Sequence, residues 1–451
     1  MQPAYRGRRA FEFKDRQPAA PGKIIGLRER LVDPVTGPIT SLTEYHPAPP
    51  SPPLHHVVTT LADDGWQAAG YETVSCGGAS LKRQEAEAAA LGEAVERSSA
   101  VLPRRGELVL ASYEEIAERS VDPSAWDLFA AETRAEHGFP YRQPSPSEVI
   151  SWTWGWSLTA SQSVLVPASR VFLALDSPLP GDFPDCSLLS GFAVAPSLEE
   201  ATLRGLLEVI ERDAFMIAWA NRLLLRHLPL AEAGASATAF RQAGLEVRCG
   251  LIELDLGAPV AIAMARSTQP GDPAFVLAAA ADLSPGDACR RALNELAANR
   301  LHVRHCLTQA DQHVPSPPEV RDETAHGLLY ARAEMLAEVA FWWEGSAEES
   351  DVTAESSPAP SLTPWRQTSS LVEAIGRAGL EVFVVDLTPP EVGELGLCAV
   401  KVLVSGAYPM NFDSRWPHFG GRRLRQAPVE VGLRDDPLPV SQLNRVPHPF
   451  P

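Results

Sequence analysis

A helix-forming stretch over residues 196–221 carries charged residues at a spacing that gathers them on one surface. Apolar residues recur there every three or four positions, and Ser197 stands where an N-cap would begin the helix. Glu208, Glu211 and Arg212 follow at i, i+3 and i+4, so their side chains share one face over adjacent turns.

The same pattern, E-x-x-E-R, occurs a second time at Glu93, Glu96 and Arg97, in a predicted helix over residues 81–100. Taken alone, each copy is explained by an ordinary surface ion pair between residues one turn apart. Two copies offer four carboxylates and two guanidinium groups that could face one another across a cleft. Such a cleft suits Mg2+ and phosphate, because Mg2+ prefers carboxylate oxygens and arginine binds phosphate through two hydrogen bonds.

Composition limits which molecules the protein can bind and where it can reside. The formal net charge of -18 argues against nucleic acid or an anionic membrane as the main partner. The N-terminal residues lack the apolar run of a signal peptide, and no stretch reaches the roughly 20 apolar residues of a membrane helix, so we expect a cytoplasmic protein. None of the few lysines lies in a G-x-x-x-x-G-K-[ST] motif, so a nucleotide must be bound without a P-loop.

We expect a catalytic domain over residues 57–451, preceded by an extended lead-in over residues 1–56. The lead-in ends in the proline-rich run EYHPAPPSPPLHH, whose adjacent His55 and His56 are poorly placed to bind one metal ion together. Residues 344–363 are acidic and rich in serine and proline, which predicts a disordered loop. The prolines of residues 443–451 predict a stiff, extended C-terminal tail.

The remaining patterns predict an α/β protein. Residues 75–80 read as a glycine turn before the first helix, and residues 151–173 as a hairpin in which tryptophans alternate with small residues. Apolar runs near residues 245–283 and 382–404 predict buried strands. A helix over residues 286–304 carries a third polar cluster at helical spacing, formed by Asn294, Glu295, Asn299 and Arg300.

Four segments in chain order, LGEAVER, LLEVIERDA, LNELAANRL and the terminal PHPFP, together resemble the YcaO family. Within that family the likeness is to ATP-dependent cyclodehydratases, which form azolines in ribosomally made peptides such as thiazole/oxazole-modified microcins and other bacteriocins. It covers roughly residue 57 to the end. The resemblance implies an α/β (α+β) fold with mixed sheets and packed helices around a central cleft for ATP and Mg2+.

The resemblance also implies the roles of individual residues. It assigns Glu93, Glu96, Glu208 and Glu211 to Mg2+ and ATP. Nucleotide binding would be completed by Arg97, Ser190, Arg212, Glu295 and Arg300. The family's P-x-P-x-P tail would place the carboxylate of Pro451 at the reaction centre, where Arg97 and Arg212 would act with it.

The chain departs from the family pattern at several positions. Ala89 stands where relatives commonly have serine, and Ser190-Gly191 replaces Asn-Gly ahead of the central helix. Ser405-Gly406 replaces Pro-Gly, and Gly78-Ala79-Ser80 replaces Gly-Lys-Gly. Loss of the amide at Ser190 puts one metal or phosphate contact in doubt, whereas retention of all four motif glutamates argues that ATP binding survives.

The implied reaction is the cyclodehydration of Cys, Ser or Thr in a precursor peptide. The side chain adds to the preceding carbonyl, the developing oxyanion takes the γ-phosphoryl group of ATP, and elimination gives thiazoline or oxazoline. A separate E1-like, leader-binding protein is expected as a partner, and the family suggests a homodimer. Two alternatives stay open: a YcaO enzyme that forms thioamides or amidines, and a catalytically reduced scaffold that binds peptide.

Overall fold

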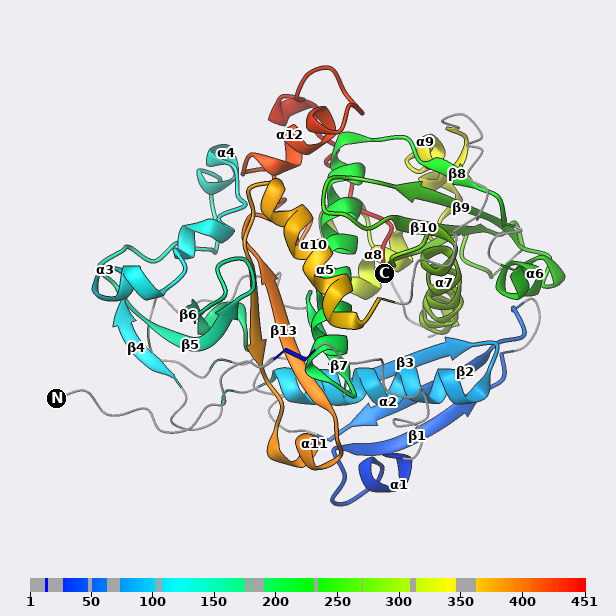
Figure 1. Ribbon diagram of the computed structural model, residues 1–451. Coiled ribbons are helices and arrows are strands. Elements are labelled where there is room, and N and C mark those ends of the chain that lie inside the picture. Colours follow the sequence, from blue (N-terminus) through cyan, green and yellow to red (C-terminus); the bar gives the residue numbers. More distant parts are fainter. Residues whose placement is uncertain are drawn as a thin grey trace.

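The computed structural model describes residues 13–14, 27–47, 51–62, 74–101, 103, 108–173, 175, 179, 190–230, 234–269, 271–308, 314–345 and 362–451. Within them, three sheets and the helices packed between them make a layered α/β structure (Figure 1). The predicted fold class is confirmed, and the strand pairings within the three sheets are all antiparallel. Of the predicted acidic loop, residues 346–361 lie outside the described part of the chain.

The first sheet has the order β1 (Ile39–Tyr45), β2 (His55–Leu61), β3 (Ser75–Ser80). The boundary predicted at residue 57 falls inside β2, and β1 of the expected lead-in pairs with β2. Ile39 is completely buried, and more exposed residues alternate with less exposed ones after it, which is the pattern of a strand with one covered face. The lead-in therefore supplies a sheet strand as well as extended surface chain.

The prediction of a glycine turn at residues 75–80 is wrong, because this segment forms strand β3. Helix α2 (Arg83–Ala100) lies directly against it. A Cβ atom on Gly78 would lie 2.2 Å from the carbonyl oxygen of Ala86, so glycine is needed for the close approach of the helix.

The second sheet has the order β11-β10-β9-β8 and confirms the apolar strands predicted there. Residues on both faces of β10 and β11 are buried, which explains why the sequences of these two strands are almost continuously apolar. Helix α7 (Pro285–Thr308) covers one face, and α5 (Leu198–Asn221) lies on the other. The strands are β8 (Arg226–Leu228), β9 (Glu246–Ile252), β10 (Val260–Arg266) and β11 (Phe275–Ala281).

The third sheet has the order β4-β5-β12-β13-β7, with β6 paired to β5 as the predicted hairpin. Trp152 of that hairpin is fully buried, as expected for a core face. The strands are β4 (Val109–Ser112), β5 (Val149–Ser157), β6 (Gln162–Pro167), β7 (Phe192–Ala195), β12 (Val382–Asp386) and β13 (Cys398–Val404).

Helix α5 lies between the second and third sheets and confirms the predicted central helix (Figure 1). The hydroxyl oxygen of Ser197 accepts a hydrogen bond from the amide of Glu200 at 3.2 Å, as an N-cap does. The remaining helices are α1 (Arg28–Leu31), α3 (Tyr113–Ile116), α4 (Ala131–Arg134), α6 (Gly234–Gln242), α8 (Glu323–Leu329), α9 (Ala340–Trp343), α10 (Pro364–Arg377), α11 (Pro390–Glu394) and α12 (Arg423–Glu430).

A buried ion network fixes α5 against α12. Asp213, which is fully buried, accepts hydrogen bonds from the guanidinium group of Arg423 at 2.7 to 3.0 Å and from the amide of Tyr408 at 2.9 Å. Arg423 also donates to both oxygens of Asp255 at 2.7 and 2.9 Å. Because these charges are held inside the protein, each depends on the others for compensation.

We expect Asp213→Ala to lower the free energy of unfolding by about 3–5 kcal/mol, because it leaves the buried Arg423 with one carboxylate fewer. Denaturant unfolding measures this loss. Glu430→Ala is the matched control, because it removes an exposed carboxylate of α12 that pairs with Arg422. This change should lower the free energy of unfolding by less than about 1 kcal/mol. Equal losses for the two variants would contradict the role given to the buried network.

Candidate functional site

The two E-x-x-E-R helices face one another in the structure. Glu96 of α2 lies in a buried environment that raises its pKa well above the ordinary value, and the next largest contribution is repulsion from Glu208 of α5. Burial also raises the pKa of Glu208. Charges that act on each other in this way belong to one site, so segments more than 100 residues apart in the sequence are brought together as the sequence predicts.

Helix α7 adds a fifth carboxylate to this group. Burial raises the pKa of Glu211 to about 8, and the neighbouring charge of Glu295 adds to the effect. Burial likewise raises the pKa of Glu295 to about 7, with further repulsion from Glu208 and Glu93. We call Glu93, Glu96, Glu208, Glu211 and Glu295 the glutamate cluster.

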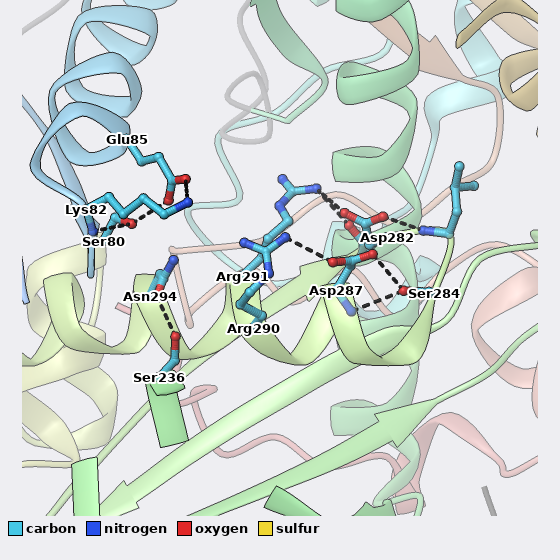
Figure 2. Close-up of polar contacts among 12 residues, drawn as sticks. Ser80, Lys82, Glu85, Ser236, Asp282, Ser284, Asp287, Arg290, Arg291 and Asn294 are labelled. Carbon is cyan, nitrogen blue, oxygen red and sulfur yellow. Dashed lines mark hydrogen bonds and ion pairs between the residues drawn. The ribbon is translucent and has the colours of Figure 1, made fainter. Parts of the chain in front are cut away.

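Cationic side chains border the glutamate cluster. Arg97 lies 3.4 Å from Glu93, and Arg212 lies 3.3 Å from Glu211 and 3.8 Å from Glu208. Arg291 of α7 acts on Glu211 and Glu295 and donates to Asp282 at 3.2 Å. Figure 2 shows Arg291 of α7 with its contact to Asp282, and Lys82 and Glu85 paired at the start of α2. The site therefore combines acidic groups with fixed positive charge.

Lys401 is a cation of the site that the sequence reasoning missed. It comes from β13, its side chain is buried, and its ammonium donates to the carbonyl oxygen of Ser190 at 2.6 Å. Burial lowers its pKa to about 7 although Glu208 and Glu96 favour the charged form. A single lysine in the otherwise apolar run AVKVLVSG was the available signal, because an unpaired lysine is rarely buried.

Backbone amides hold two of the glutamates. The amide of Gly77 in β3 donates to Glu93 at 2.8 Å, and the amide of Gly191 donates to Glu208 at 3.1 Å. Gly191 has a φ of 87°, and a Cβ atom there would lie 2.2 Å from the carbonyl oxygen of Val402. Only glycine satisfies both the backbone conformation and this contact.

The cluster has the chemistry needed to bind Mg2+ with phosphate. The buried Nε of Arg212 lies 3.3 Å from Oε1 of Glu211, so these two atoms form an ion pair with each other. Carboxylate oxygens are ligands that Mg2+ prefers, and the arginines beside them can bind phosphate oxygens.

A small pocket of about 50 Å3 adjoins the cluster. Its wall includes Ser190 and the two cations Arg212 and Lys401, which also lie beside the glutamate cluster. Arg170, Trp126 and Tyr408 form other parts of its wall, so it offers cationic and aromatic contacts to a bound molecule.

The C-terminal tail runs through the interior. The indole of Trp219 donates to the carbonyl oxygen of Val446 at 2.8 Å. The hydroxyl of Tyr330 donates to the carbonyl oxygen of Pro447 at 2.6 Å. The rings of His326 and His448 stack with centroids 3.9 Å apart. The expected stiff tail is therefore held by specific contacts along its length.

The tail ends beside the glutamate cluster. The guanidinium carbon of Arg212 lies 4.4 Å from the ring centroid of the buried Phe450. Pro451 is partly exposed and packs against Gly327 of α8. If Gly327 carried a Cβ atom, that atom would lie 2.9 Å from the Cβ atom of Pro451. The last residue thus follows a residue that contacts Arg212 beside the cluster.

Most of the third polar cluster has partners outside the glutamate cluster, and the assignment of Arg300 to the nucleotide site stays a prediction. Arg300 is 2% exposed and pairs with the buried Asp272. Asn294 accepts a hydrogen bond from Ser236 (Figure 2), and Asn299 donates to a backbone carbonyl oxygen of β11. Of this group, Glu295 reaches the glutamate cluster.

Comparison with known proteins agrees with this arrangement. The family model described as YcaO cyclodehydratase, binding ATP and Mg2+, matches residues 77–408. The chain belongs to the YcaO family. A YcaO-family chain is an ATP-dependent enzyme whose cofactors are ATP and Mg2+, and the residues around the glutamate cluster fit both. No helix in the described residues is long and apolar enough to cross a bilayer.

Individual relatives extend the comparison. An uncharacterised protein of Methanothermobacter thermautotrophicus is 29% identical over 83% of this chain and 90% of its own length. A heterocyclase solved in complex with substrate and cofactor has a TM-score of 0.78 at 24% identity, over 99% of this chain and 60% of that one. YcaO from Methanopyrus kandleri, bound with AMPPCP and Mg2+, has a TM-score of 0.60 at 21% identity. This match covers 86% of this chain and 89% of that one. These structures share the fold, and this YcaO-family chain spans about 60% of the heterocyclase's length.

The raised pKa values predict how stability depends on pH without Mg2+ and nucleotide. Glu211 titrates near 8 when folded and near 4.5 when unfolded, so the folded chain binds more protons between these values and loses stability as the pH rises. The loss amounts to at most about 1.4 kcal/mol per pH unit. We expect Glu211→Gln to reduce the difference in unfolding free energy between about pH 5 and about pH 8. Glu430→Gln, a change at the surface, is the control and should leave this difference as in the wild type. If Glu211→Gln also left it unchanged, the raised pKa of Glu211 would be contradicted.

Proposed function

We propose that this YcaO enzyme uses ATP to convert Cys, Ser or Thr residues of a precursor peptide into thiazolines or oxazolines. The observation that carries the proposal is the position of the tail: Phe450 packs under Arg212, and Arg212 contacts Glu208 and Glu211. This contact supports a role at the site for the carboxylate of the adjacent Pro451.

Each residue has a separable task in this proposal. Bound Mg2+-ATP supplies the phosphoryl group that turns the peptide oxygen into a leaving group. Glu93, Glu96, Glu208 and Glu211 hold the metal, and Glu295 and Ser190 complete the nucleotide site. Arg97 and Arg212 stabilise negative charge that develops on the transferred group, an electrostatic role that requires no covalent bond to the enzyme.

The carboxylate of Pro451 is proposed as the base that accepts the proton from the thiol or hydroxyl group of the substrate. Its effectiveness depends on position, since a base must lie within hydrogen-bond reach of the proton. The contacts of Trp219 and Tyr330 with the tail support this role because they limit its movement.

We also propose that a separate E1-like protein binds the leader of the precursor peptide. The YcaO subunit is proposed to be a homodimer that works in the cytoplasm, where ribosomal peptides are made.

Two other functions were left open by the sequence. Thioamide or amidine formation would use the same nucleotide site with a different nucleophile, and the ordered proline tail favours the azoline. A catalytically reduced scaffold was suggested by Ala89 and Ser190, but the complete glutamate cluster favours an enzyme.

Glu208→Gln should lower ATP consumption in the presence of precursor peptide and leader-binding partner by about 100-fold or more, because it weakens the hold on metal and phosphate. Phosphate release measures this loss, and mass spectrometry of the peptide detects one lost water per ring. Glu430→Gln, a surface change on α12, should retain full activity. Full turnover by Glu208→Gln would refute the site, and absence of turnover in the wild type with any partner would support the scaffold.

Adding one glycine after Pro451 should abolish ring formation while leaving nucleotide affinity unchanged, because it moves the terminal carboxylate without removing the buried tail. Nucleotide titration and peptide mass spectrometry measure the two properties on the same preparation. Gln442→Ala, an exposed change near the start of the tail, is the control. Normal ring formation by the extended chain would exclude the terminal carboxylate as the base.

A further inference from the structure

We propose a second metal site, for Zn2+ or a similar borderline divalent ion, formed by Glu44, His46 and His55. One oxygen or nitrogen atom of each residue lies within 4.8 Å of the other two, and no other group of three potential ligands in the described residues meets this distance. We call these three residues the strand-end site. It lies outside residues 77–408, which the family model matches, and shares no residue with the glutamate cluster.

The pairing of β1 with β2 creates this site. Tyr45 pairs with His56, so the next residues outward, His46 and His55, come opposite one another with ring centroids 6.1 Å apart. Glu44 and His46 are two residues apart and therefore project from the same face. His56 projects to the other face and is 3% exposed, so it is not part of this group.

The carboxylate of Glu44 is oriented toward both histidines. The Nε of Arg83 donates to its Oε2 at 2.8 Å, and the other oxygen, Oε1, lies 2.9 Å from Nδ1 of His55 and 4.0 Å from Nε2 of His46. This hydrogen bond from Arg83, followed by the one from His55, lowers the pKa of Glu44 and keeps it ionised. Metal-bound carboxylates are commonly positioned by such an outer partner.

The spacing of the three atoms suits a tetrahedral ion. Bond lengths near 2.0–2.1 Å place tetrahedral ligands about 3.4 Å apart, and the two observed separations from Oε1 lie on either side of this value. The side chain of His46 is 75% exposed and His55 is partly exposed, so small rotations can bring both nitrogens to the ion.

The donor atoms also decide the class of metal. Two imidazole nitrogens and one carboxylate oxygen suit Zn2+, Co2+, Ni2+ or Cu2+, whereas Mg2+ prefers oxygen ligands and retains much of its water. The fourth position is open to water. A bound ion would join the end of β1 to the beginning of β2 and, through Arg83, to α2, so its expected effect is to stabilise the first sheet.

The test uses the full chain after treatment with a chelator and removal of any polyhistidine tag. Zn2+ titration calorimetry in excess Mg2+ should show one site per chain in the wild type, and Zn2+ should raise the melting temperature. His46→Ala and His55→Ala should each weaken this binding at least about tenfold and remove the thermal shift. His137→Ala, which alters an exposed histidine elsewhere, should behave as the wild type.

Co2+ provides a readout independent of stability, because its visible absorption is strong in a tetrahedral site and weak in an octahedral one. Such a band in the wild type that both histidine variants lack would support the site. Absence of Zn2+ binding by the wild type, or equal binding by His46→Ala and His55→Ala, would overturn the proposal. Since His46 is largely exposed, its replacement should leave the fold intact, and circular dichroism verifies this.

Discussion

The central constraint on this molecule is the burial of like charges at one place. Three helices bring Glu96, Glu208, Glu211 and Glu295 together; Glu211 is buried and the other three are partly exposed. Loss of solvation is the main cause of the raised pKa of each. A folded protein retains such an arrangement only if other contacts hold the helices together against the repulsion. The apolar cores on both sides of α5 and the Asp213–Arg423 network supply those contacts.

Periodicity in the sequence was sufficient for the central helices and the apolar strands, because each buries one side against a large core. It failed at β1 and β3. Gly77 and Gly78 resemble a turn in a linear sequence, and only the close contact between β3 and α2 explains them as strand residues. The order of strands in the sheets depends on contacts between distant segments, which periodicity does not encode.

The E-x-x-E-R spacing and the proline tail identified the two ends of the candidate site, but not its full composition. Lys401 was missed because one lysine in a strand carries no periodic signal, and its nearness to Glu208 is a property of the fold. Arg300 lies five residues beyond Glu295 in the same helix, and the sequence does not reveal that Asp272 is its partner. Local spacing thus groups residues on a helix face, whereas tertiary contacts select those that share a site.

Helix α5 joins stability and chemistry through consecutive residues. Glu211 and Arg212 belong to the candidate site, while the next residue, Asp213, anchors the helix to α12. Each residue of an α-helix advances its side chain by about 100° around the axis. Inserting or deleting a single residue earlier in α5 would therefore rotate either the anchor or the glutamates out of place, and the length of this helix should tolerate far less change than that of the loops around it.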